Sequence, residues 1–349
     1  MLCYNYSIWE GGFVMKESLY LSAYSYLDGT SSVLRADFDE AKGELSVTGR
    51  IALHMPDWIS ADGQNLFVAH AARPLTATPE SIQEKIDGAA FSVAMISRPD
   101  FSLSCDIPLV VHNTCHILAK GGWLFSADYA AGEFGAQTGE TGRVVRHTGT
   151  GPNAARQEAP HPHSVNLTPD GKYLTVCDLG IDAVMMYPFD KKTGLGDPVR
   201  LDCPPGSGPR HIAFTKKHMY IVCELSNQIL RRALTENFPF VDAKSTLPRG
   251  YTEESYAAAI HFSPDGRRLG VSNRGHDSVA LFDLLPGGGL AEPVFVETVR
   301  TPREFAFSPS GRWIIGGSQT EGVVTATPAR AGGRAKPILP VRSACMIFR

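Results

Sequence analysis

The chain of 349 residues contains no run of 18 consecutive apolar residues, and this excludes a helix that spans a membrane. Apolar residues at the i, i+3, i+4, i+7 spacing of an amphipathic helix are almost absent, so a repeat fold of helix pairs is excluded too. Neither sign of charge is in large excess, because 33 Lys and Arg stand against 36 Asp and Glu, a net charge of −3. We therefore expect neither a membrane nor a nucleic acid as partner.

The seven cysteines form no pattern of a disulfide framework or a zinc site. Their number is odd, and no Cys-x-x-Cys pair occurs. His161 and His163 would share one face of a strand, but no further ligand stands at a suitable spacing. The start of the chain lacks the regions of a signal peptide. We predict reduced thiols, a cytoplasmic location, and neither a metal nor a cofactor.

The first fourteen residues, MLCYNYSIWEGGFV, show no periodicity, whereas a strand pattern begins at Met15. The codons of Trp9, Glu10 and Gly11 can contain the purine run of a bacterial ribosome-binding site shortly before the Met15 codon. We predict that residues 1–14 are a non-native extension and that one domain covers 16–349. The alternative is a genuine N-terminal arm.

A unit of a polar turn followed by two short apolar strands recurs along the chain. The clearest copies are SPDGRRLGVSNRGHDSVALFDL and TPDGKYLTVCDLGIDAVMMYPFD, and the turns lie near residues 17, 63, 122, 171, 217, 266 and 311. The strands are rich in β-branched and aromatic residues and are bounded by Asp-Gly or Pro turns. Repeats of this length with about four short strands each are typical of a propeller. We predict an all-β fold, a seven-bladed β-propeller.

Two features of the repeat predict how the ring is built. The one long interval between turns points to an inserted loop over residues 73–112, with a helix-like stretch at Pro79–Asp87. A strand is missing before Leu19, while ACMIF (344–348) at the end of the chain fits that place. We predict that the C-terminal strand pairs with the N-terminal blade and closes the ring, so that no long sheet edge is exposed.

Polar residues recur just before the innermost strand of several units, where an apolar core has no need of them. These residues are His116, His161, His163, Arg210, His211, His261 and Arg303. A second set follows the next strand of each unit, and it includes Asp128, Asp178, Glu224 and Arg274. Repeat geometry should gather both sets around one axis, in a pocket suited to a small anionic molecule with acid/base groups beside it.

Each of these residues also has a structural interpretation. A lone histidine in a propeller strand is more often hydrogen-bonded in the framework than catalytic, and Arg274 could brace a turn through Asp265 or Asp277. The common repeat position of Arg210, Arg274 and Arg303 favours a binding site instead.

Four segments, QEAPHPHSVNLTPDGKYLTVCDLG, GSGPRHIAF, SNRGHDSVALFDL and PREFAFSPSGRWIIGG, resemble the β-propeller lactonase family. That family contains propeller-type 6-phosphogluconolactonases and fungal carboxy-muconate lactonizing enzymes, and the resemblance covers most of residues 16–349. It implies a seven-bladed propeller and chemistry on a lactone. It also implies an active-site cluster of His163 or His161 with Arg210, Glu224 and Arg274.

Two reactions fit this set of residues. In hydrolysis of a sugar-acid lactone, as by a 6-phosphogluconolactonase, Glu224 or His163 would activate water, and Arg210 and Arg274 would stabilise the substrate anion and the oxyanion. In the alternative, a muconate-type cycloisomerase, the same base would supply a proton to a dicarboxylate. A non-catalytic scaffold is the least favoured interpretation.

For either reaction we assign catalytic roles to His163, Glu224, Arg210 and Arg274. Substrate-binding roles are assigned to His161, His211, Arg303, His116 and His261. The partner is a small anionic lactone or carboxylate, and the sequence makes no prediction of the oligomeric state.

Overall fold

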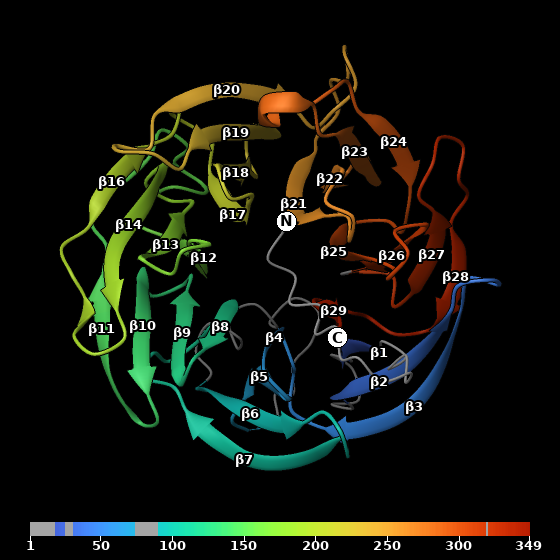
Figure 1. The fold of residues 1–349 in the computed structure, drawn as a ribbon, viewed down its shortest axis with the longest axis horizontal. Coiled ribbons are helices and arrows are strands. Elements are labelled where there is room, and N and C mark those ends of the chain that lie inside the picture. The colour runs from blue at the N-terminus through green and yellow to red at the C-terminus, as the bar shows by residue number, and fades with distance from the viewer. Residues whose placement is uncertain (1–17, 25–30, 74–89, 319) are drawn as a thin grey trace.

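Seven antiparallel sheets surround a central axis in the computed structural model, which describes residues 18–24, 31–73, 90–318 and 320–349 (Figure 1). Six of the sheets have four strands, and the seventh has a short fifth strand. The predicted seven-bladed β-propeller is confirmed. No helix among the described residues has both the length and the apolar character needed to cross a bilayer.

We number the blades along the chain and give the strands of each from the axis outward. Blade 1 contains β29 (Met346–Phe348), β1 (Ser18–Tyr24), β2 (Ser31–Asp39) and β3 (Glu44–Ala52). Blade 2 contains β4 (Trp58–Asp62), β5 (Asn65–Ala71), β6 (Phe91–Ser97) and β7 (Ser102–Pro108). Blade 3 contains β8 (His116–Lys120), β9 (Trp123–Asp128), β10 (Glu133–Thr138) and β11 (Thr141–Arg146). Blade 4 contains β12 (Pro162–Leu167), β13 (Tyr173–Asp178) and β14 (Ala183–Asp190), with β15 (Gly194–Leu195) and β16 (Val199–Asp202) both paired to β14.

The remaining blades follow the same plan. Blade 5 contains β17 (Pro209–Phe214), β18 (His218–Cys223), β19 (Gln228–Ala233) and β20 (Phe240–Ser245). Blade 6 contains β21 (Tyr256–Phe262), β22 (Arg268–Arg274), β23 (Ser278–Asp283) and β24 (Val294–Glu297), with a short 3-10 helix, η1 (Pro286–Gly288), before β24. Blade 7 contains β25 (Pro302–Phe307), β26 (Trp313–Ser318), β27 (Val324–Pro328) and β28 (Lys336–Leu339).

The turn that opens each repeat has a physical cause in its sequence. In the turn between β21 and β22, Ser263 Oγ donates to Asp265 Oδ1 at 2.6 Å and accepts the backbone N–H of Arg268 at 3.0 Å. Thr168 makes the same bonds in blade 4, to Asp170 at 2.7 Å and from the N–H of Tyr173 at 3.1 Å. These bonds fix the tight connection between the first and second strand, because the hydroxyl group accepts a backbone N–H of the turn.

Burial changes from the axis to the rim. The second strands β9, β13 and β18 are buried at every position but the first, because neighbouring blades pack on both of their faces. The outermost strands β7, β11 and β20 are mostly exposed. The apolar core therefore lies between blades; one cluster joins Val184 and Met186 of blade 4 to Ile221 and Leu230 of blade 5. Burying side chains of this size contributes about 1.5–3 kcal/mol each.

The two ends of the described chain meet in blade 1. β29 pairs antiparallel with β1, with Leu19 opposite Phe348 and Leu21 opposite Met346 (Figure 1). The C-terminal strand thus forms the innermost strand of the sheet whose other strands come from the start of the described chain.

The predicted inserted loop over 73–112 requires a correction. β6 and β7 lie inside that range and are the third and fourth strands of blade 2; β6 pairs in regular register with β5, and β7 pairs with β6. The additional residues of this repeat lengthen the connection between β5 and β6, and the four-stranded sheet is complete. The helix expected at Pro79–Asp87, and residues 1–14, lie outside the described residues.

Candidate active site

Four inner strands carry an extra residue at the same place near their start; in β21 the shift falls at Ala258 and Ala259, and in the other three it falls at a polar residue. The register between first and second strand shifts at His163 in β12, at Arg210 in β17 and at Arg303 in β25. Such a β-bulge bends the strand and re-aims the side chain of the extra residue. In blades 4, 5 and 7 the repeat therefore places a polar residue at the same position of the inner strand, and these are the candidates His163, Arg210 and Arg303.

Two further blades have the same irregularity. The N–H of Asp57 bonds to the oxygen of Ala69 at 2.9 Å, although Ala69 is the register partner of the following residue, Trp58. Cys115 makes the equivalent bond to Ala127 at 3.0 Å. Asp57 and Cys115 thus occupy in blades 2 and 3 the position that His163, Arg210 and Arg303 occupy elsewhere.

We call Asp57, Cys115, His163, Arg210 and Arg303 the bulge ring. Arg303 and Arg210 act electrostatically on Asp57, on Cys115 and on His163, so side chains from five blades converge on one region. Burial and then Asp57 raise the pKa of the Cys115 thiol to about 12, so it stays neutral at physiological pH.

Three arginines meet on the carboxylate of Glu224, which directly follows β18. Glu224 Oε2 lies 3.0 Å from Nε of Arg210 and 2.8 Å from Nη2 of Arg274, at the end of β22. Oε1 accepts a hydrogen bond from Nη2 of Arg156 at 2.7 Å. Because one carboxylate faces three guanidinium groups, the cluster carries excess positive charge and suits an anion.

The charges around Glu224 decide its protonation. Burial alone would raise the pKa of this carboxyl, but Arg274 and Arg210 outweigh burial and hold the pKa far below its ordinary range. Glu224 is therefore ionised and a very weak proton acceptor. Its position favours holding the arginines in place over acting as a base.

His163 is uncharged, whereas Glu224 is ionised. Its side chain is buried, and its Nδ1 has no hydrogen-bond partner in the part of the chain that the structure describes. Burial, and then the charge of Arg210, lowers the pKa of His163 well below its ordinary value. The ring is neutral at pH 7 and has an unbonded nitrogen that can accept a proton, and its lowered pKa makes it a weaker base than a free imidazole.

His211 and His116 form a packed wall beside Arg210. Nη1 of Arg210 donates to Nε2 of His211 at 3.0 Å, and the His211 ring contacts the rings of His116 and Trp58 at 5.4 and 5.2 Å between centroids. Burial, followed by Arg210, lowers the pKa of His116 to about 3. Both histidines are neutral, largely apolar groups beside the bulge ring.

His161 and His261 have protein partners. The ring nitrogens of His161 lie 2.8 Å from the oxygen of Tyr129 and 3.1 Å from Glu158 Oε1, and the ring stacks on Tyr129. Nε2 of His261 lies 2.6 Å from Glu304 Oε1, further along its strand than the bulge ring. The structural interpretation of a lone histidine thus describes His161, whose two nitrogens are both occupied.

Arg156, which the sequence analysis missed, reaches Glu224 from the connection between β11 and β12. Gln157 holds that segment, because its Nε2 donates to the oxygen of Leu179 at 2.8 Å and its Oε1 accepts the N–H of Asn153 at 3.1 Å. The oxygen of Ala159 lies 1.9 Å from where a Cβ on residue 180 would stand, so the segment can approach only a glycine there. The Gly in DLG therefore helps to place Arg156.

The segment before Arg210 is also fixed by a side chain. Asp182, in the turn after β13, accepts the N–H groups of Gly206 at 2.6 Å and Gly208 at 2.8 Å. Gly208 has a φ of +63°, a conformation that suits glycine. This brace between blades 4 and 5 sets where the Arg210 bulge begins.

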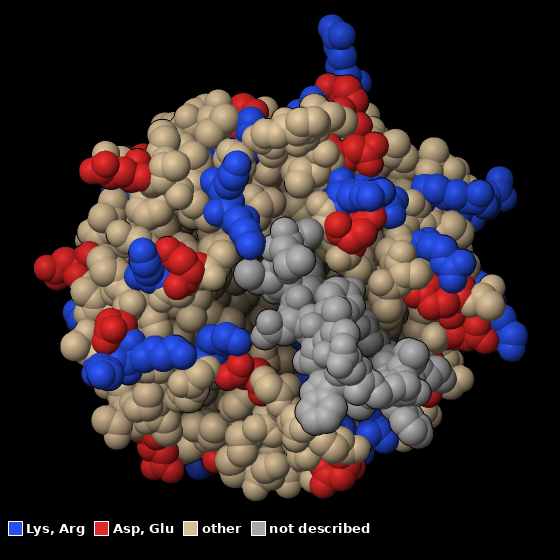
Figure 2. All heavy atoms as spheres, in the orientation of Figure 1, with Lys and Arg blue, Asp and Glu red and all other residues tan. Residues whose placement is uncertain are grey.

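Outside the ring, the charged surface is mixed. On the face shown in Figure 2, both signs of charge are spread around the blades. Among the described residues, no group of three His, Cys, Asp or Glu side chains has an arrangement that could hold a metal ion. The concentration of positive charge at Glu224 is thus a feature of the interior.

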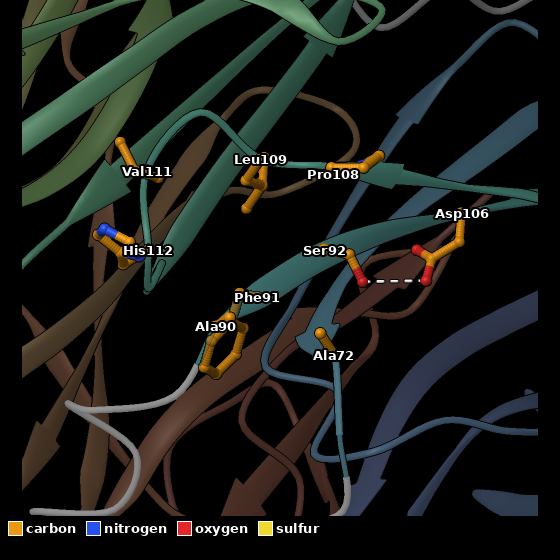
Figure 3. A pocket seen from close by; sticks show the side chains of 9 residues that line it. All are labelled: Ala72, Ala90, Phe91, Ser92, Asp106, Pro108, Leu109, Val111 and His112. Carbon is orange, nitrogen blue, oxygen red and sulfur yellow. Dashed lines mark hydrogen bonds between the residues drawn. The ribbon is translucent and has the colours of Figure 1, made fainter.

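A separate cavity of about 330 Å³ lies near the start of β6 and the end of β7. Its wall consists of Ala72, Ala90, Phe91, Ser92, Asp106, Pro108, Leu109, Val111 and His112 (Figure 3). Ser92 Oγ donates to Asp106 Oδ2 at 3.0 Å, and His70 Nε2 lies 3.1 Å from Asp106 Oδ1. These polar groups bond to one another, and none belongs to the bulge ring or the Glu224 cluster.

Comparison with known proteins gives one consistent family. The family model described as "Lactonase, 7-bladed beta-propeller" matches residues 18–330. A 6-phosphogluconolactonase of Bacillus subtilis is 39% identical over 188 residues, which are 50% of this chain and 52% of that protein. The chain thus spans about half the length of this curated relative.

Solved structures share the whole fold. A periplasmic gluconolactonase of Pseudomonas aeruginosa matches with a TM-score of 0.80 at 26% identity, over 95% of this chain and 98% of that one. A protein of Bacteroides fragilis described as a putative 6-phosphogluconolactonase matches with a TM-score of 0.80 at 22% identity, over 97% and 100% of the two chains. At that identity the second match bears on the fold alone.

Proposed function

Because the chain belongs to the seven-bladed β-propeller lactonase family, we propose that it hydrolyses the lactone of a sugar acid and that 6-phosphogluconolactone is its substrate. The observation that carries the proposal is the meeting of three arginines on buried Glu224, next to the neutral imidazole of His163. The named relatives hydrolyse, by their descriptions, lactones of this class. They carry no cycloisomerase description, so we do not pursue cyclisation.

His163 takes the role of general base. Its unbonded Nδ1 accepts a proton from water as the water oxygen attacks the carbonyl carbon of the lactone. Glu224 does not suit this role, because the arginines lower the pKa of its carboxyl and so weaken it as a proton acceptor. It acts as a positioning residue, because it fixes the guanidinium groups of Arg210 and Arg274.

The arginines stabilise negative charge at two places. Arg210 is almost fully buried and belongs to the bulge ring with His163, so it stabilises the oxyanion that forms on the carbonyl oxygen. The side chain of Arg156 is 34% exposed. It lies toward solvent, where a phosphate at the far end of a sugar lactone can be held by its fork of N–H donors.

The direct experiment is to follow acid release from 6-phosphogluconolactone and from gluconolactone with the purified protein, after subtraction of spontaneous hydrolysis. We expect acceleration of both, with the higher kcat/KM for the phosphorylated lactone. Arg274→Ala should lower kcat/KM at least about tenfold, the loss of one charge-assisted contact. Arg200→Ala, which removes a surface arginine paired with Asp202, is the matched control and should leave kcat/KM unchanged. No acceleration above the spontaneous rate would rule out the proposal.

A further inference from the structure

The mechanism above uses His163 and Arg210 of the bulge ring and leaves Asp57, Cys115 and Arg303 without a role; Asp57 is the one carboxyl among these five residues. It lies in blade 2, while His163 lies in blade 4, and Cys115 of blade 3 stands between them in the ring. Arg303 and Arg210, from blades 7 and 5, both act on the Asp57 carboxyl. This carboxyl therefore lies within electrostatic range of Arg210, the arginine assigned to the oxyanion, and it comes from a different blade than Arg210 and His163.

Hydrolysis of an alkyl lactone needs a proton that the base does not supply. When the tetrahedral intermediate collapses, the ring oxygen leaves as an alkoxide, which is a poor leaving group unless it is protonated. The surroundings raise the pKa of Asp57 and lower the pKa of Glu224. Two carboxyls whose pKa values are shifted in opposite directions are suited to different roles.

We propose that Asp57 is the general acid of the reaction and gives its proton to the ring oxygen of the lactone as the carbon–oxygen bond breaks. This inference rests on the lactonase function proposed above. It assigns three roles to three members of the bulge ring: His163 accepts the proton of water, Arg210 holds the oxyanion, and Asp57 protonates the leaving oxygen.

A bond forms between the water oxygen and the carbonyl carbon, one water proton passes to His163 Nδ1, and the carbonyl electron pair moves onto oxygen beside Arg210. When the C=O bond re-forms, the bond from carbon to the ring oxygen breaks, and its electron pair takes the proton of Asp57. His163 then loses its proton to solvent, Asp57 regains one, and the product acid ionises. The net change is lactone plus water to hydroxy-carboxylate plus one proton.

The environment of Asp57 agrees with this role. Burial raises the pKa of Asp57, and the charges of Arg303 and Arg210 oppose the rise only in part. Trp58, the next residue, packs its ring against His116 at 4.2 Å between centroids and against His211 at 5.2 Å, so the backbone at Asp57 is anchored to the wall of the site. The Asp57 carboxyl is thus held near the reacting groups, and its raised pKa favours the protonated form that a general acid needs.

The alternative role for Asp57 is that of a counter-charge to Arg303, without contact with the reaction. Leaving-group chemistry separates the two roles. The leaving oxygen of gluconolactone is an alcohol, whereas that of dihydrocoumarin is a phenol, which departs without prior protonation. We expect Asp57→Asn to lower kcat on gluconolactone about 100-fold or more, but kcat on dihydrocoumarin less than about threefold. His163→Gln should lower both alike, because both reactions need the base.

A second readout uses the sugar lactone alone. The wild-type pH profile of kcat/KM should fall on its alkaline side as the acid loses its proton, and Asp57→Asn should abolish that fall and leave the acidic limb. Equal losses on the two lactones, or an alkaline limb that persists in Asp57→Asn, would overturn the assignment. Wild-type turnover of gluconolactone tests the lactonase function separately, so failure of one does not imply failure of the other.

Discussion

Arg210 and Glu224 form an ion pair with 3.0 Å between Nε and Oε2, and the two side chains are only 1% and 3% exposed. Arg210 lies in the first strand of blade 5 and Glu224 directly follows the second, next to Cys223, which pairs with Pro209, so the sheet brings the two residues together. Removing one partner of such a pair strongly destabilises the protein, because the remaining charge stays buried in a medium that solvates it poorly.

Glu224→Gln should therefore destabilise the protein strongly. The substitution keeps the shape of the side chain but leaves three arginines without their shared counter-charge. We expect the free energy of unfolding to fall by about 3–5 kcal/mol, as measured by urea denaturation at pH 7.5. Glu44→Gln is the control, because Glu44 pairs with Lys336 at the exposed rim, and its loss should cost less than about 1 kcal/mol. Similar values for the two variants would contradict a buried, mutually dependent cluster.

The repeat explains why much of this arrangement could be predicted. The turns at Thr168 and Ser308 are recognisable from their local sequence. Their positions determine which residue of the preceding strand occupies each place in the repeat. His163 and Arg303 stand five residues before these turns. Arg210 stands five residues before Thr215 in the same way. Their gathering at one axis follows from the geometry of a closed ring.

The same count identifies Asp57, which the sequence analysis overlooked. Asp57 stands five residues before Asp62, whose Asp-Gly turn had been recognised in the sequence, and Cys115 stands five before Lys120. Arg156 carries no comparable signal. It lies in a connection without repeat character, and its approach to Glu224 depends on contacts of Gln157 and on the space at Gly180. Such contacts join segments that are distant in sequence, and no local pattern encodes them.

Stability should decline as the pH falls from 7.5 to 5.5, because three buried histidines are neutral in the folded protein. Burial lowers the pKa values of His116, His163 and His211, whereas in the unfolded chain they take up protons near pH 6.5. Below pH 6.5 the unfolded state thus binds more protons than the folded state. The free energy of unfolding is therefore at its full value above pH 6.5 and falls as the pH drops toward the pKa of the folded histidines, which is about 3 for His116. We expect a loss of about 1 kcal/mol for each histidine at pH 5.5.

His116→Gln tests this assignment within the same experiment. The backbone N–H of Val165 donates to His116 Nδ1 at 3.4 Å, a bond that the protonated ring cannot accept. The free energy of unfolding of the variant should change less between pH 7.5 and 5.5 than that of the wild type, by the uptake of about one proton on unfolding. Urea denaturation at the two pH values measures this difference. An unchanged dependence would mean that His116 becomes charged without opening the fold.

Arg156→Ala should reveal which end of the substrate this residue holds. Arg156 is the most exposed arginine on Glu224, and its loss leaves Arg210 and Arg274 on that carboxylate. If Arg156 contacts the phosphate, KM for 6-phosphogluconolactone should rise about tenfold or more, with little change for gluconolactone. Initial rates over a range of both substrates measure the difference, with Arg200→Ala as the surface control. An equal rise for both lactones would place Arg156 at the sugar instead.

Ile347→Pro should show how far the propeller depends on β29. Tyr20 faces Ile347, and the adjoining hydrogen bonds between Ser18 and Arg349 make this a hydrogen-bonded pair in the alternating ladder. Proline removes the N–H and leaves the Tyr20 oxygen without its partner, whereas Ile347→Ala shortens the same side chain and keeps the backbone bond. We expect the proline variant to be less stable than the alanine variant by about 1–3 kcal/mol in urea denaturation. Since Leu21 and Met346 belong to one apolar cluster with Ile315 and Ala326 of blade 7, the loss should affect the whole unfolding transition. Equal stabilities, or a separate early transition in the proline variant alone, would show that the ring holds without this strand.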